Sequence, residues 1–68
     1  MFELKKAIRY GLGLRGLSQR QLAKHLGMTV QHVNCMYQGR YDTTFATAEK
    51  MASIFGVALS EFVEWGEI

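Results

Sequence analysis

Three amide side chains follow one another at helical spacing in the middle of the chain, at Gln31, Asn34 and Gln38. Val33 marks the inward side of the helix that they would share, at about 100° per residue. The opposite, outward side then carries Gln31, Cys35 and Gln38, with Asn34 at its flank, and it has no formal charge. An amide can donate and accept hydrogen bonds together, which suits the adenine edge in the major groove of DNA. The pattern makes this face a candidate for base contacts, although amides also serve simply as solvated polar residues.

Two helix-start signals position this face. Ser18 is a favourable N-cap residue, and Gln21 completes a capping-box pattern, so a helix is predicted over about 18–26. Thr29 is a second N-cap, for a helix over about 29–38, and a glycine follows each of these helices. Two short helices joined by so few residues must cross at a steep angle, which is the helix-turn-helix geometry.

The remaining segments also have helical periodicity. A first helix is predicted over about 2–14, where two glycines either fray the second half or allow a close backbone approach. A fourth helix is predicted over about 44–55, and Ser60 is expected to cap a short fifth one. The apolar stripe expected on the fourth helix consists of Phe45, Ala48, Ala52 and Phe55. The predicted fold class is all-α: a compact five-helix bundle in which residues 1–68 form one helix-turn-helix domain.

Composition excludes several classes of protein. The chain has 68 residues, near the lower size limit for one apolar core, and its only cysteine, Cys35, cannot form a disulfide within a monomer. His25 and His32 have no recognised zinc spacing with Cys35, and no spacing typical of a catalytic site is present. We therefore expect no metal, no cofactor and no enzymatic activity. No apolar run reaches the roughly 18 residues of a membrane span and no signal peptide is recognisable, so we expect a cytoplasmic protein without a membrane partner.

Formal charge is distributed unevenly along the chain. Residues 1–40 carry seven cationic side chains and one carboxylate, a net charge of +6. Residues 41–68 carry one cation and five carboxylates, a net charge of −4. A domain with this asymmetry can present its basic part to a polyanion such as nucleic acid. Many small domains are asymmetric in this way, so the charge pattern only supports the indication given by the helices.

Two segments resemble a known family in register. They are LSQRQLAKHLGMTVQHVNCMYQGR, over 17–40, and AEKMASIFGVALSEF, over 48–62. Together they resemble the lambda-repressor-like (Cro/cI, XRE-type) helix-turn-helix DNA-binding family over nearly the whole chain. The matching residues are Gln19, Ala23, Gly27, Val33, Gly39, Ala52, Gly56, Val57 and Leu59. The resemblance implies that the third helix lies in the major groove of double-stranded operator DNA.

The resemblance also implies which residues contact DNA. Those expected at base edges are Thr29, Val30, Gln31, Asn34 and Cys35. Those expected at phosphates are Ser18, Gln19, Arg20, His32, Gln38, Arg40 and Thr43. For His32 a passive surface role is an equal alternative. Amide contacts to adenine and methyl contacts to thymine are expected more than arginine contacts to guanine.

Three positions depart from the family pattern. Many members pair an arginine of the first helix with a glutamate of the recognition helix, where this chain has Leu12 and Tyr37. An apolar contact is expected in place of that ion pair. Val30 stands where several members have an amide, so we expect an apolar contact there. The loop over 39–44 lacks the proline often found before the fourth helix, which leaves the path of the loop open.

The function implied is that of a sequence-specific transcriptional regulator, a phage- or prophage-type Cro-like repressor of bacterial or phage origin. Family members usually bind as two-fold dimers, so a homodimer on DNA is expected. The expected dimer surface consists of Val57, Leu59, Phe62 and Trp65, of which the two aromatic residues suit a core equally well. The protein would either exclude RNA polymerase from an operator or contact polymerase to help it. The alternative is an antitoxin, or another protein-interaction module of this fold, in a toxin–antitoxin pair.

Overall fold

The two helix-start signals form as predicted. In the computed structural model, which describes residues 2–67, Ser18 Oγ accepts a hydrogen bond from the Gln21 backbone N–H at 3.1 Å. The Ser18 N–H donates to Gln21 Oε1 at 2.9 Å, which completes the capping box and starts α2 (Gln19–Leu26). Thr29 Oγ1 accepts from the backbone N–H of His32 at 3.1 Å and starts α3 (Val30–Tyr37). Both helices therefore begin directly after their predicted N-caps.

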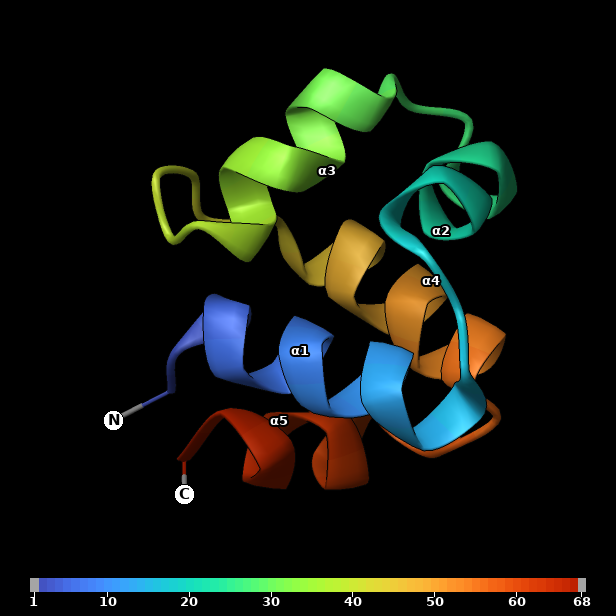
Figure 1. Ribbon diagram of the computed structural model, residues 1–68. Helices are drawn as coiled ribbons and strands as arrows, with labels where there is room; N and C mark the ends of the chain where they lie inside the picture. Colours follow the sequence, from blue (N-terminus) through green and yellow to red (C-terminus); the bar gives the residue numbers. More distant parts are fainter. Residues whose placement is uncertain (1, 68) are drawn as a thin grey trace.

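Three further helices complete the bundle: α1 (Leu4–Arg15), α4 (Phe45–Phe55) and α5 (Leu59–Glu67). The all-α, five-helix prediction is confirmed. Figure 1 shows α2 and α3 at one end of the molecule, α1 and α5 side by side at the other end, and α4 between them. The principal-axis extents are 25, 24 and 21 Å, so every helix lies close to the surface as well as to the centre.

All five helices contribute side chains to one apolar core. The largest fully buried side chains are Phe55, Phe62, Ile8, Leu22, Met36, Met51 and Val33. Phe55 of α4 and Phe62 of α5 stack with their ring centroids 6.1 Å apart, and Trp65 lies 6.0 Å from Phe55. Because a chain of this size buries little apolar area, these aromatic rings supply a large share of the core.

Helix α1 differs in its bounds from the predicted helix over 2–14. Of the two alternatives for its glycines, the close approach is observed at Gly11, where an added Cβ would lie 2.7 Å from the Phe55 ring. Gly13 faces open space, and the helix continues through it to Arg15 instead of fraying. Arg15 Nε then donates to the carbonyl oxygen of Phe55 at 2.8 Å and ties the end of α1 to the end of α4. With 12 residues α1 is the longest helix, and none in the described range is long and apolar enough to cross a membrane.

Two predictions for the last helices are wrong. The backbone N–H groups of Glu61 and Phe62 donate to the Ala58 carbonyl, so α5 begins before Ser60, which lies in its first turn and is not the N-cap. Phe45 does not belong to the buried stripe of α4, because it is 69% exposed. As the first residue of α4, it lies beyond the buried part of that helix, which begins at Ala48.

Candidate nucleic-acid interface

The turn between α2 and α3 sets the direction of α3. Gly27 has a φ of +71°, a left-handed conformation that glycine adopts without steric cost. Its N–H donates to the Lys24 carbonyl at 3.3 Å, and the Met28 N–H donates to the Ala23 carbonyl at 3.0 Å. These bonds end α2 and turn the chain sharply within two residues. As a result α3 crosses α2 at a steep angle, as Figure 1 shows.

Helix α3 is anchored on one side only. Val33 and Met36 are fully buried and Tyr37 is half-buried, as the helical spacing predicts. The residues predicted to contact bases lie on the other side: Thr29, Val30, Gln31 and Asn34 are exposed, and Cys35 is half-buried. We call these five residues the recognition face. It carries no formal charge, and Val30, 41% exposed, provides its apolar part.

The structure joins two predicted DNA contacts that come from different helices. Asn34 Nδ2 donates a hydrogen bond to Gln19 Oε1 at 3.0 Å. Gln19 is the first residue of α2 and Asn34 lies in the middle of α3, so the bond bridges the two helices of the motif. The predicted phosphate contact and the predicted base contact therefore lie side by side.

The loop between α3 and α4 returns along the recognition face. The Tyr41 ring lies 5.3 Å from the His32 ring, centroid to centroid, and is 52% exposed. With Thr29, Gln31 and Cys35 these two rings line a hollow of about 170 Å³. Tyr41 is thus a candidate contact residue that sequence reasoning missed. An aromatic residue in a loop beside a polar helix was the available signal, but the path of residues 39–44 was needed to interpret it.

The predicted phosphate contacts fall into two groups at the margins of the recognition face. Ser18, Gln19 and Arg20 gather at the start of α2, where unpaired backbone N–H groups attract an anion. His32, Gln38 and Arg40 are exposed along α3 and just after it. Thr43 differs from these, because it is half-buried and its hydroxyl donates to the Thr44 carbonyl at 3.3 Å.

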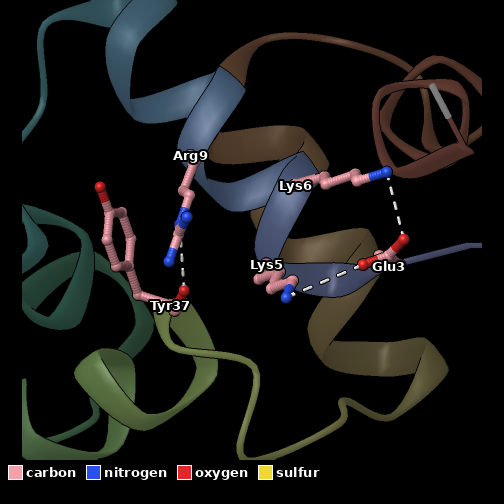
Figure 2. Close-up of polar contacts among 5 residues, drawn as sticks. All are labelled: Glu3, Lys5, Lys6, Arg9 and Tyr37. Atoms are coloured by element: carbon pink, nitrogen blue, oxygen red, sulfur yellow. Dashed lines mark hydrogen bonds and ion pairs between the residues drawn. The ribbon is translucent and has the colours of Figure 1, made fainter.

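Beside Leu12 and Tyr37, the structure has a contact that the sequence did not predict. Figure 2 shows the Arg9 guanidinium beside Tyr37: Cζ of Arg9 lies 4.7 Å from the ring centroid, and Nε donates to the Tyr37 carbonyl at 3.2 Å. A cation therefore does connect α1 to the end of α3, but it comes from one turn earlier and stacks on an aromatic ring. Leu12 is buried and lines the same hollow as Tyr37, so the apolar contact expected between these two residues stays a prediction beside the observed Arg9 contact.

A second charged group lies at the start of α1. The Lys6 ammonium is 3.1 Å from the Glu3 carboxylate, and Lys5 is 4.0 Å from it (Figure 2). The hydrogen bond and the charge of Lys6 lower the pKa of Glu3 below its ordinary value. All three side chains are well exposed, so the ion pairs of Glu3 with Lys5 and Lys6 contribute little to the stability of the fold.

The predicted dimer surface is corrected in part. Phe62 is fully buried inside the core and cannot face a second chain, whereas Trp65 packs against Phe55 and keeps 8% of its surface exposed. Val57 and Leu59 are half-buried and keep some exposed area. Of the expected dimer surface, Phe62 is therefore removed, and the homodimer stays a prediction.

No group of three or more His, Cys, Asp or Glu side chains within residues 2–67 is placed to hold a metal ion. The exposed end of the helix-turn-helix motif instead offers groups that form hydrogen bonds. The recognition face supplies neutral donors and acceptors, and its margins supply cations and backbone N–H groups. This arrangement matches the division between base contacts and phosphate contacts in protein–DNA interfaces.

Comparison with known proteins agrees with this geometry. Residues 8–62 match the sequence profile of a helix-turn-helix family. The chain is also 34% identical over 58 residues to an uncharacterized HTH-type transcriptional regulator of Methanocaldococcus jannaschii, a match that covers 85% of this chain and 88% of the relative. The family consists of DNA-binding transcription regulators and not of enzymes. The chain therefore belongs to the XRE-type, lambda-repressor-like helix-turn-helix family of DNA-binding proteins.

Proposed function

We propose that this protein is a sequence-specific regulator of transcription that binds operator DNA by placing α3 in the major groove. The observation that carries the proposal is the recognition face: an uncharged, amide-bearing surface on a helix whose opposite side is fully buried. A nonspecific DNA-binding protein would instead need Lys and Arg on this face, because phosphate contacts supply nonspecific affinity.

The proposed contacts follow from the chemistry of each side chain. Gln31 and Asn34 would form hydrogen bonds with adenine edges, and Val30 would contact a thymine methyl group. Groups at the start of α2 and after α3, with Gln19 and Arg40 as the main ones, would hold the phosphates on either side. These backbone contacts fix the register of α3 in the groove.

The finer form of the proposal is a Cro-like repressor of phage or prophage type that acts in the cytoplasm. It would bind as a homodimer with recognition helices about 34 Å apart, one turn of DNA. Val57 and Leu59 support a subunit contact through their remaining exposed area. The bound protein would exclude RNA polymerase from a promoter. At a different operator position it would instead contact polymerase directly.

Selection from random duplexes tests the proposal. We expect the purified protein to enrich one short motif, arranged as a palindrome whose half-sites lie about one helical turn apart. A pool without enrichment would overturn sequence-specific binding. A single, unrepeated half-site would retain specific binding but reject the homodimer.

A second candidate function is that of an antitoxin, and one surface favours it. Tyr10 of α1 is 51% exposed and its ring centroid lies 4.9 Å from that of Trp65, at a mostly apolar hollow between α1 and α5. A folded toxin could bind there without covering α3. Co-expression with the neighbouring gene tests this: rescue from toxicity that is lost in Tyr10→Asp but retained in Gln31→Ala would support the antitoxin.

A further inference from the structure

A mostly apolar hollow of about 470 Å³ lies between α1 and α5, and none of the proposed DNA contacts uses it. The described residues that line it are Lys6, Arg9, Tyr10 and Trp65. We propose that this hollow binds a small aromatic carboxylate, and that the bound ligand weakens operator binding by drawing Arg9 away from Tyr37. The second half of the proposal rests on the proposed function, since it concerns regulation of the same DNA-binding surface.

The walls of the hollow suit an aromatic ring. Tyr10 is 51% exposed, and its ring centroid lies 4.9 Å from that of Trp65, with 55° between the ring planes. Trp65 is in turn held from behind by Phe55 and Phe62, with centroids 6.0 and 6.1 Å away, so it forms a fixed floor. A ring placed against Tyr10 would cover apolar surface that water now reaches. Sites for small ligands have this size and this mostly apolar lining.

The rim of the hollow selects the charge of the ligand. Lys6 and Arg9 are exposed cations on α1, and no carboxylate is among the described residues that line the hollow. Lys6 Nζ also lies 3.1 Å from the Glu3 carboxylate, which compensates part of its charge. Arg9 is therefore the main anion-binding group, because a planar guanidinium can hold a carboxylate through two parallel hydrogen bonds. An aromatic acid satisfies both the walls and the rim.

Arg9 also connects the hollow to the recognition helix. Its Nε donates to the Tyr37 carbonyl at 3.2 Å, and its Cζ lies 4.7 Å from the Tyr37 ring centroid (Figure 2). A carboxylate is a stronger acceptor than a peptide carbonyl because it is charged, so a bound ligand would turn the guanidinium toward the hollow. The last turn of α3 would then lose one hydrogen bond and one stacking contact. Since α1 and α5 lie at the end of the molecule away from α2 and α3, the ligand would act on DNA binding only through Arg9.

Ligand binding is tested first without DNA. Trp65 is the only tryptophan of the chain, so its indole N–H gives one signal in proton–nitrogen NMR spectra. Naphthoate should shift this signal, and neutral naphthamide, with its substituent at the same ring position, should bind about tenfold more weakly. Arg9→Met should bind the two compounds equally weakly. The matched control is Leu14→Ala, because Leu14 is exposed on the same helix but does not line the hollow, and this variant should bind as the wild type does.

Regulation is tested next, by titration of the selected operator with and without saturating naphthoate. The operator affinity of the wild type should fall about fivefold in naphthoate, and operator DNA should weaken naphthoate binding by the same factor. In Arg9→Met the operator affinity should be the same with and without naphthoate. Circular dichroism melting of each variant verifies that it is folded.

The outcomes are distinct. If naphthoate leaves the Trp65 indole signal unshifted, or if naphthamide binds as well as naphthoate, the carboxylate site is rejected and the hollow is left to a protein partner such as the toxin of the second candidate function. If naphthoate binds but the operator affinity does not change, the regulatory half of the proposal is overturned while the proposed function stands. If the protein binds no operator even without naphthoate, the proposed function itself fails, and the NMR titration still decides the ligand site.

Discussion

Gln31 is the residue of the recognition face whose amide is most available to DNA. It is exposed on α3 and, unlike Asn34, forms no side-chain hydrogen bond with another described residue. In free protein the Gln31 amide forms hydrogen bonds with water. A matching base edge would replace these bonds at both the donor and the acceptor of the amide, whereas a wrong base would leave one of the two groups without a partner. The selectivity contributed by Gln31 therefore comes from the penalty for a mismatch.

Replacing Gln31 measures this penalty. Gln31→Ala is expected to weaken binding to the selected operator by about 1–3 kcal/mol and to relax the base preference at one position. Titrations of the operator and of its single-base variants give both quantities. Lys24→Ala is the control, since this exposed cation of α2 would contribute equally to all sequences. A uniform loss of affinity in Gln31→Ala would contradict a base contact.

Among the helices, the features that sequence predicts well are local. The capping box of Ser18 and the cap of Thr29 need only partners three residues away, so both were identified from residue types and spacing. The burial of Val33 and Met36 also follows from the period of one helix. For these reasons the position and the orientation of α3 could be predicted.

Contacts between helices could not be predicted, because they depend on how the helices pack. The Arg9–Tyr37 stacking, the Gln19–Asn34 bond and the Tyr41–His32 contact each join residues from different elements. The same limit explains Phe62 and Trp65. The apolar periodicity of α5 shows which of its sides is buried. It does not show whether that side packs against α1 and α4 of the same chain or against a second chain.

The packing of α1 on α4 predicts opposite effects for two glycines of the same helix. Gly11→Ala should lower the free energy of unfolding by about 1–3 kcal/mol, because the new methyl group overlaps the Phe55 ring. Gly13→Ala should raise it by about 0.5–1 kcal/mol, because the position is helical and open. Thermal unfolding followed by circular dichroism measures both changes. Stabilisation by Gly11→Ala would show that the helices lie further apart than described.

The Arg9 contact predicts how firmly α3 is held at its C-terminal end. Arg9→Met should lower the free energy of unfolding by about 1 kcal/mol, through loss of the stacking on Tyr37 and of the bond to its carbonyl. It should also speed hydrogen exchange at the last amides of α3. Arg9→Lys keeps the charge but not the planar guanidinium, so it should rescue only part of the loss. Full rescue by lysine would mean that charge alone matters.

For the whole molecule, charge is arranged to favour one orientation on DNA. Arg20, Lys24 and Arg40 lie around the end formed by α2 and α3, whereas at the other end the three glutamates of α5 lie beside four cations of α1. The charges of the second end nearly cancel, so a polyanion would attract mainly the first end. The protein should therefore approach DNA with α3 leading, before any base contact forms.

Salt dependence tests this orientation. A plot of log affinity against log salt concentration should fall with a slope that steepens by about 0.9 for each phosphate neutralised. Arg40→Gln should make the slope shallower by about one unit if Arg40 contacts a phosphate. Lys50→Gln is the matched control, because Lys50 Nζ lies 3.5 Å from the Leu26 carbonyl and belongs to α4. Equal slopes for wild type and Arg40→Gln would remove Arg40 from the interface.

The hydrogen bond from the Glu3 N–H to the Gly66 carbonyl, at 2.7 Å, has a practical consequence for engineering. It holds the first and last described segments together beside α5, and Figure 1 shows both on the side of the molecule that faces away from α3. A fluorescent protein, an affinity tag or an effector domain joined next to residue 2 or residue 67 would therefore extend away from the DNA-facing side of the bound molecule. A short peptide that joins residue 67 to residue 2 would likewise form a cyclic chain without approaching the DNA.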